Sequence, residues 1–397
     1  MNSNHKNNRL YLLLEILMVS TKLGLTSFGG PIAHLGYFHE EYVRRKKWID
    51  DQNYADLVAL SQFLPGPASS QVGIGIGVMR AGVLGGIVSF IGFTLPSVIV
   101  LILFASLLQD IDIKNSGWIH GLKLVAVPIV AQAILGMVKN LTPDLKRKAL
   151  ALFAMMATLI WQTTFTQIAV ILISSIVGYF LYQDNENNDK TTLITNISKK
   201  ISIFCLALFF LLLVLLPLFS SFTSSIWISI FDSFYRAGSM VFGGGHVVLP
   251  LLEREFVPTG WLSKETFLAG YGVTQAVPGP LFTFAAYLGT IMVGFRGGII
   301  ATIAIFLPAF LLIIGTLPFW SSMRRSSKLR RALLGINAAV VGILISAFFN
   351  PIWISSVFSI FDLLIVAILF SMLVIIKLPP WIIVLVGAIS GEILSRI

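Results

Sequence analysis

Residues 61–67 read SQFLPGP, and residues 274–280 read TQAVPGP. Each stretch places two prolines around one glycine inside a long apolar region. Proline cannot donate a backbone hydrogen bond inside a helix, and the residue before a proline avoids helical dihedral angles. Each stretch therefore predicts a point where one helix ends and another begins. The return of the same break in the second half of the chain indicates an internal repeat.

Other short motifs recur in the same order around the two Pro-Gly-Pro stretches. The offset between partners drifts only from 214 to 210 residues, which chance matches would not do. The chain is therefore predicted to contain one unit twice. The partners are Phe28-Gly29-Gly30 with Phe242-Gly243-Gly244, Glu41-Tyr42-Val43 with Glu255-Phe256-Val257, Trp48 with Trp261, Gly85-Gly86 with Gly297-Gly298, Leu95-Pro96 with Leu307-Pro308, and Asn140 with Asn350.

The composition favours a membrane protein. Of the 397 residues, 56% are hydrophobic and 12% are charged, whereas soluble domains carry roughly 25% charged residues. Apolar stretches such as 83–108 and 149–183 are long enough to cross a hydrocarbon core about 30 Å thick. The single cysteine, Cys205, excludes a disulfide framework and a cysteine-based metal cluster. We therefore expect an all-α polytopic membrane protein, surrounded by lipid.

The basic residues indicate how the two repeats are oriented. The net charge is +10, but lysine and arginine cluster beside apolar spans, which favours the positive-inside rule over nucleic-acid binding. Residues 139–148 hold four basic side chains and their counterpart 350–362 none, whereas residues 321–331 hold five and their counterpart 109–117 one. The repeats are therefore predicted to be inverted, with the N-terminus in the cytoplasm. The predicted parts are an N-terminal membrane repeat 1–183, a polar cytoplasmic connector 184–200, an additional membrane helix 201–224, and a C-terminal repeat 225–397.

The broken helices are candidate binding elements. Inverted repeats with helices broken at matching positions are typical of secondary transporters. A helix that begins inside the membrane offers free backbone amides and the positive end of its dipole to an anion. A structural kink without ligand contact is the alternative for the Pro-Gly-Pro stretches, and close helix packing is the alternative for the glycine motifs. The candidate substrate-binding residues here are Pro65, Gly66, Pro67, Pro278, Gly279 and Pro280, the nearby Ser69, Gln62 and Gln275, and the glycines Gly29, Gly30, Gly243 and Gly244.

Two aligned pairs of charged residues lie in apolar surroundings. Lys22 aligns with Arg236, each six residues before its Phe-Gly-Gly motif. A cation at bilayer depth costs about 2.5–3.5 kcal/mol, so each needs a carboxylate or a substrate as counter-ion, unless it snorkels to a headgroup. Substrate contact is the favoured role. Glu41 aligns with Glu255, and these carboxylates could carry a proton or form interfacial salt bridges with Arg44 and Arg254.

Enzymatic chemistry is not indicated. The chain lacks a His-Glu-x-x-His zinc motif and a Gly-x-Ser-x-Gly nucleophile motif. We therefore expect no catalytic residue, no metal site and no cofactor. The sequence leaves a homodimer open.

The paired motifs resemble the chromate transporter family in its long, two-repeat form. The resemblance rests on residues 28–31, 41–43 and 48, on Gln62 through Pro67, on 93–96, and on 242–252, Trp261 and Gln275 through Pro280. It implies an inner-membrane exporter of chromate, with sulfate as a similar dianion. Two alternatives stay open. A proton-coupled importer of sulfate or a related anion would need Glu41 or Glu255, and a lipid-handling or scaffold protein would tolerate methionine at Lys22 and Arg236.

Overall fold

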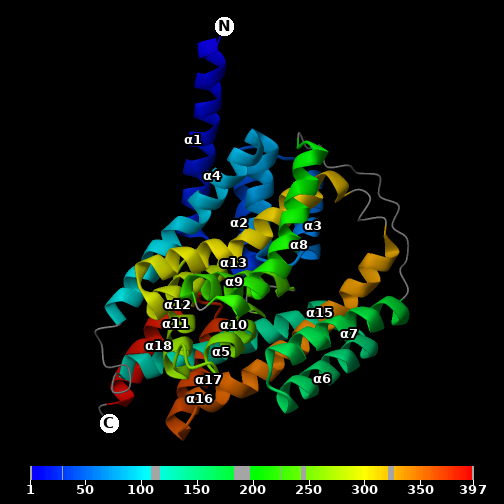
Figure 1. Cartoon of the computed structure of the whole chain (residues 1–397). Helices are drawn as coiled ribbons and strands as arrows, with labels where there is room; N and C mark the ends of the chain where they lie inside the picture. The colour runs from blue at the N-terminus through cyan, green and yellow to red at the C-terminus, as the bar shows by residue number, and fades with distance from the viewer. Residues whose placement is uncertain are drawn as a thin grey trace.

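The structure is a computed structural model, and it describes residues 2–28, 30–108, 117–182, 197–223, 225–242, 247–320 and 326–395. These residues form helices and connecting turns, with no strand among them (Figure 1). Five helical stretches in this part of the chain are long and apolar enough to cross a membrane. The chain is thus an all-α, multi-pass membrane protein, as its composition predicts. The five are α4 (Ala68–Leu108), α5 (Gly117–Leu141), α8 (Lys199–Phe222), and the stretches that begin with α13 (Phe295–Thr316) and α15 (Ser327–Ala347).

Shorter helices complete both halves. The first half adds α1 (Asn2–Thr26), α2 (Gly30–Phe38), a π-helix (His39–Arg45), α3 (Asp51–Phe63), α6 (Leu145–Ile160) and α7 (Thr164–Leu181). The second half adds α9 (Ile226–Met240), α10 (Val248–Phe256), α11 (Lys264–Ala276), a 3-10 turn (Leu281–Thr283), α12 (Phe284–Val293), a second 3-10 turn (Leu317–Phe319), a π-helix (Phe348–Trp353), α16 (Ile354–Ser356), α17 (Ile360–Val374) and α18 (Pro380–Leu394).

Helices end where the proline and glycine motifs predict. α3 ends at Phe63 and α4 begins at Ala68, with the first Pro-Gly-Pro stretch between them. In the second half α11 ends at Ala276, before the equivalent stretch. The central glycines, Gly66 and Gly279, have φ angles of +114° and +105°. Side chains rarely adopt such angles, so glycine is required at the turning point of each break.

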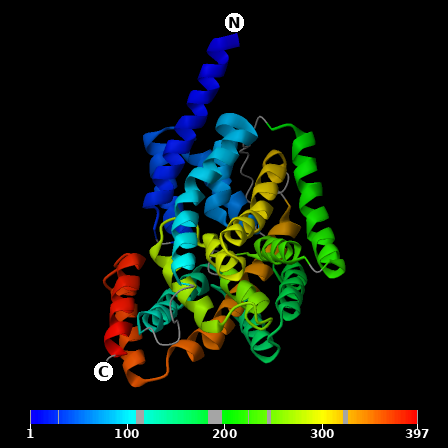
Figure 2. The same ribbon diagram turned by 60° about the vertical axis from the view of Figure 1, so that its left-hand side comes forward.

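Equivalent helices of the two halves run in opposite directions. The part of α4 after Gly82 corresponds to α13 by the sequence offset. In Figures 1 and 2 this part of α4 runs away from the end of the molecule that carries the N-terminus, whereas α13 runs toward that end. The two helices cross in the centre, where the rings of Phe90 and Phe306 lie 5.1 Å apart. This arrangement agrees with the inverted orientation inferred from the loop charges.

The two halves exchange their last helices. α5 of the first half packs against α17 and α18 of the second half, while α15 of the second half packs against α6 and α7 of the first half. Figure 1 shows α15, α6 and α7 side by side. Glycines allow these contacts, because Gly335 lies against Gly178 and Gly121 lies against Gly387. The halves are therefore interlocked, and one hydrophobic core contains residues of both.

α8 corresponds to the additional apolar helix predicted between the repeats. Residues 184–196 of the predicted polar connector lie outside the described residues, as do Gly29, Gly243 and Gly244 of the glycine motifs.

Candidate functional site

Each helix break is hydrogen-bonded to the opposite half of the chain. The Gly66 amide donates to the carbonyl of Val241 at 2.7 Å, and the Gly279 amide donates to the carbonyl of Ser27 at 2.9 Å. Ser27 and Val241 are equivalent residues that precede the two glycine motifs. Each broken helix thus meets the glycine motif of the opposite half, and we call this crossing the junction. Inverted-repeat transporters bind their substrates between such interrupted helices, so the junction is the candidate site.

The helix that follows the break differs between the halves. In the first half α4 begins directly after Pro67, so Ser69 and Ser70 lie in its first turn and its free amides face the break. In the second half a 3-10 turn, Leu281–Thr283, comes before α12. The Thr283 amide is bonded to the Pro280 carbonyl in that turn. The helix terminus predicted for both halves is therefore formed directly only in the first.

Other predicted residues lie unequally at the junction. Ser69 is buried, and its hydroxyl lies 3.3 Å from Nδ1 of His34. Gln275 is also buried, but its equivalent Gln62 has an exposed side chain. The structure therefore brings Gln275 into the buried region and leaves Gln62 outside it. Gly30 begins α2 with a φ angle of +80°.

In the first half the predicted cation and the predicted carboxylate form an ion pair. Lys22 Nζ lies 2.7 Å from Glu41 Oε2. The Lys22 side chain is 50% exposed, whereas that of Glu41 is 8% exposed. Arg45 Nη1 lies 3.6 Å from the same carboxylate oxygen. Because Glu41 is nearly buried, it depends on these cations for charge compensation.

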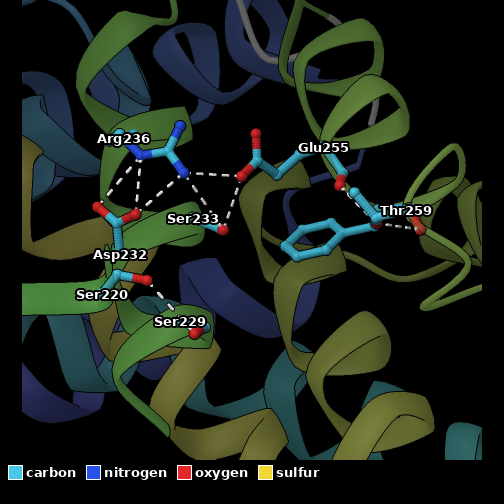
Figure 3. A network of polar contacts seen from close by, with 8 residues as sticks. Ser220, Ser229, Asp232, Ser233, Arg236, Glu255 and Thr259 are labelled. Carbon is cyan, nitrogen blue, oxygen red and sulfur yellow. Dashed lines mark hydrogen bonds and ion pairs between the residues drawn. The ribbon is translucent and has the colours of Figure 1, made fainter. Parts of the chain in front are cut away.

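In the second half the equivalent pair gains a further carboxylate. The Arg236 guanidinium lies between Asp232 and Glu255 (Figure 3). Its Nη2 lies 2.7 Å from Glu255 Oε1 and 3.0 Å from Asp232 Oδ2, and its Nε donates to both oxygens of Asp232 at 3.1 Å. Ser233 also donates to Glu255 at 2.7 Å. Two carboxylates therefore share one guanidinium, which leaves this cluster with one excess negative charge when both carboxylates are ionised.

Both cations have a carboxylate counter-ion, which was one of the two partners that the sequence analysis considered. The predicted interfacial partners of the carboxylates are engaged elsewhere. Arg44 lies 3.6 Å from Glu40. Arg254 donates to the carbonyl of Thr158 at 2.8 Å and to those of Trp161 and Thr163 at 3.4 Å. Arg254 therefore caps the C-terminal end of α6.

Sequence analysis overlooked two of the residues described here. Asp232 lies one helical turn before Arg236, and Met18 takes its place in the first half. A carboxylate four residues before a helical arginine is a recognisable ion-pair signal. His34 is not predicted from the sequence, since a lone histidine gives no spacing signal. A comparison of the halves position by position shows that Val248 takes its place in the second half.

A surface hollow of about 670 Å³ lies beside the basic cluster 44–47. Its wall includes Arg44, Lys47, Trp48 and Asp50. The backbone and side-chain amides of Asn53 donate to Asp50 and lower the pKa of that carboxyl. The hollow is separate from the junction. Among the described residues no group of three histidine, cysteine or acidic side chains could hold a metal ion.

Comparison with known proteins identifies the family. A family described as Chromate transporter matches residues 14–179 and, a second time, residues 228–392. A probable chromate transport protein of Synechococcus elongatus is 27% identical over 348 residues, 85% of this chain and 84% of that protein. A chromate transport protein of Cupriavidus metallidurans is 26% identical, over 85% of this chain and 82% of its own. An uncharacterized transporter of Methanocaldococcus jannaschii is 27% identical, over 84% and 83%.

No solved structure matches this chain. The family match spans both halves, and its members point to a transporter rather than an enzyme. The chain therefore belongs to the chromate transporter family.

Proposed function

We propose that this protein exports chromate, a tetrahedral dianion, across the cytoplasmic membrane by alternating access at the junction. The observation that carries the proposal is the reciprocal pair of hydrogen bonds from Gly66 to Val241 and from Gly279 to Ser27. Two interrupted segments that meet in the middle of a duplicated membrane protein form the kind of site that secondary transporters use. Sulfate is a second expected substrate because it has the same shape and charge.

Electrostatics favours outward transport. Moving one charge across a potential of 100 mV is worth about 2.3 kcal/mol, so a dianion leaving a negative-inside cell gains roughly 4.6 kcal/mol. Export therefore needs no coupling ion on electrical grounds. Uptake of the same dianion would need at least two co-transported protons to offset this electrical work.

The proposal includes an orientation and a division of the chain. The N-terminus and residues 184–200 lie in the cytoplasm of this inner-membrane protein, and 1–183 and 225–397 are the inverted repeats that meet at the junction. Residues 201–224 form the additional helix between them. Backbone amides after the breaks bind the substrate together with Lys22 and Arg236, once these cations release their carboxylates.

Flux into proteoliposomes tests this function. Purified protein is reconstituted, and uptake of radioactive sulfate and of chromate is followed under an imposed potassium diffusion potential. We expect uptake that accelerates when the vesicle interior is positive and that chromate and sulfate inhibit mutually. No flux above protein-free vesicles at either polarity would refute the proposal.

A proton-coupled importer is the second candidate. The observation that favours it is the cluster of Asp232 and Glu255 around one arginine, because excess negative charge in a partly buried place favours proton uptake. The same vesicles distinguish it. Sulfate uptake driven by an acidic exterior without a membrane potential, and abolished in Glu255→Gln, would select import over export.

A further inference from the structure

Buried polar atoms without a hydrogen-bond partner gather around the junction. An unsatisfied buried polar group costs about 1–3 kcal/mol, so a local group of them calls for an explanation. In the part of the chain that the structure describes, the segments meeting at the junction contribute Ser27 Oγ, Ser61 Oγ, Ser70 Oγ, Gln71 Oε1, Thr94 Oγ1 and Gln275 Nε2.

Contacts connect these residues to both breaks. The carbonyl of Ser27 accepts the Gly279 amide at 2.9 Å. The side-chain amide nitrogen of Gln71, Nε2, donates to the Pro65 carbonyl at 2.8 Å, which holds Gln71 against the first break. His34 lies 3.3 Å from the hydroxyl of Ser69, and its ring packs edge-on against Phe93, the neighbour of Thr94. Ser27 thus lies at the second break, and His34 and Gln71 lie at the start of α4. Ser61, Ser70 and Gln275 belong to the segments that flank the two breaks.

Most of the equivalent positions in the second half are apolar. The residues that correspond to Ser27, His34, Ser69, Gln71 and Thr94 are Val241, Val248, Phe282, Phe284 and Phe306. Two hydroxyls do recur, at Thr274 and Thr283, and both donate to carbonyls of their own segment at 2.8 and 2.7 Å. The matching region of the second half is therefore mostly apolar, and its two hydroxyls are bonded within their own segments. Gln275 is the second-half side chain in this group with an unpaired buried atom.

We propose that the transported dianion binds at a single site on the first-half side of the junction. Its ligands are the hydroxyls of Ser61, Ser69 and Ser70, the imidazole of His34 and the first amides of α4. This inference rests on the proposed function and goes beyond it, since it assigns recognition to one repeat. The helix start alone would not define a site, but Ser61 and Ser70 are buried to 1% and 2% exposure and their hydroxyls are free to donate.

The proposed ligands suit a substrate that must be both bound and released. These ligands are hydroxyls, a ring N–H and backbone amides, which are neutral dipoles. Lys22 and Arg236 have carboxylate partners in this structure, so the neutral donors hold the dianion until these cations release their carboxylates. Neutral donors can hold a fully deprotonated tetrahedral anion such as sulfate or chromate without the strong ionic bond that would trap it.

Sulfate binding to the purified full-length protein tests the assignment. We compare Ser70→Ala with Thr283→Ala, which removes a hydroxyl at the equivalent position of the other half. Because Ser70 has no partner for its hydroxyl, Ser70→Ala is expected to melt no lower than wild type without ligand, so its folding is not in question. Loss of one hydrogen bond to a charged ligand should raise the Kd for sulfate about tenfold or more. Thr283→Ala should lose stability and keep the wild-type Kd within about twofold, and His34→Gln should resemble Ser70→Ala.

The outcomes separate this inference from the proposed function. One sulfate per chain, weakened by Ser70→Ala and His34→Gln and unaffected by Thr283→Ala, supports a single first-half site. Wild-type transport with unchanged binding in Ser70→Ala and His34→Gln overturns the inference and leaves the function intact. Two equivalent sulfates per chain also overturn it. Absence of both flux and binding for sulfate and chromate in wild type overturns the proposed function itself.

Discussion

Replacing Lys22 by methionine separates a structural role of this cation from a role in binding substrate. Methionine keeps most of the side-chain length and removes the charge. In the structure the change leaves Glu41, 8% exposed, with Arg45 at 3.6 Å as its remaining cation. The nearly buried carboxylate then loses its closest counter-ion, at 2.7 Å.

The expected loss of stability lies between the values measured for buried and for exposed ion pairs. Removing one partner of a fully buried pair costs about 3–5 kcal/mol, while exposed pairs contribute about 0–1 kcal/mol. Glu41 is buried but Lys22 is half exposed, so we expect Lys22→Met to lower the free energy of unfolding by about 1–2 kcal/mol. The double variant Lys22→Met/Glu41→Gln removes the unpaired charge and should recover most of this loss.

Two assays together read out the two roles. Unfolding by SDS titration in mixed micelles measures stability for wild type, both single variants and the double variant. Sulfate flux in proteoliposomes measures function for the same four proteins. We expect the double variant to be stable and still defective in flux, because substrate contact by Lys22 is not restored. A double variant as unstable as Lys22→Met would contradict the ion-pair energetics, and one with wild-type flux would contradict the substrate role of Lys22.

Four further substitutions have expected outcomes that follow from the geometry. Gly66→Ala and Gly279→Ala should each cost about 1–2 kcal/mol of stability in SDS titration, because alanine is strained at φ angles of +114° and +105°; unchanged stability in both would contradict the backbone assignment. Arg254→Met should cost about 2–3 kcal/mol, because three carbonyls at the end of α6 lose a charged donor; faster backbone hydrogen exchange near residues 158–163 is the specific readout, and unaltered exchange there would argue against the cap. Asp144 accepts a hydrogen bond from the Arg147 backbone amide at the start of α6, and this bond lowers the pKa of the Asp144 carboxyl. The ionised carboxyl therefore stabilises the fold fully above its unfolded-state pKa of about 3.9, and this stabilisation is lost as the pH falls through the lower folded-state pKa. Asp144→Ala should therefore be about 1 kcal/mol less stable than wild type at pH 7, with a difference that shrinks below pH 4; a constant difference would show that the charge is not involved.

The helix breaks and the inverted orientation could be predicted because their causes are local. Proline and glycine act on the few residues around them, and loop charges report the side of the membrane without reference to tertiary contacts. The sequence also aligned Lys22 with Arg236 and Glu41 with Glu255. It could not establish that these residues bond to each other, because that depends on how the π-helix at His39–Arg45 folds back toward α1.

The exchange of helices between the halves could not be predicted in the same way. An apolar helix such as α18 offers similar surfaces to either repeat, and the choice of α5 as neighbour depends on the close approach of Gly121 and Gly387. The difference between the two breaks was visible in the sequence, as Ser69 and Ser70 against Phe282 and Thr283. The matching motifs alone do not reveal it, because it lies in positions where the two copies differ.

Anomalous scattering from crystals of this protein grown with selenate would locate a tetrahedral dianion directly. Selenate has the shape and charge of sulfate and chromate, and selenium identifies its position without ambiguity. We expect one strong peak per chain at the junction, within hydrogen-bond distance of Ser70 and the first amides of α4. A peak confined to the basic surface cluster at residues 44–47, or equal peaks beside both Pro-Gly-Pro breaks, would contradict this account.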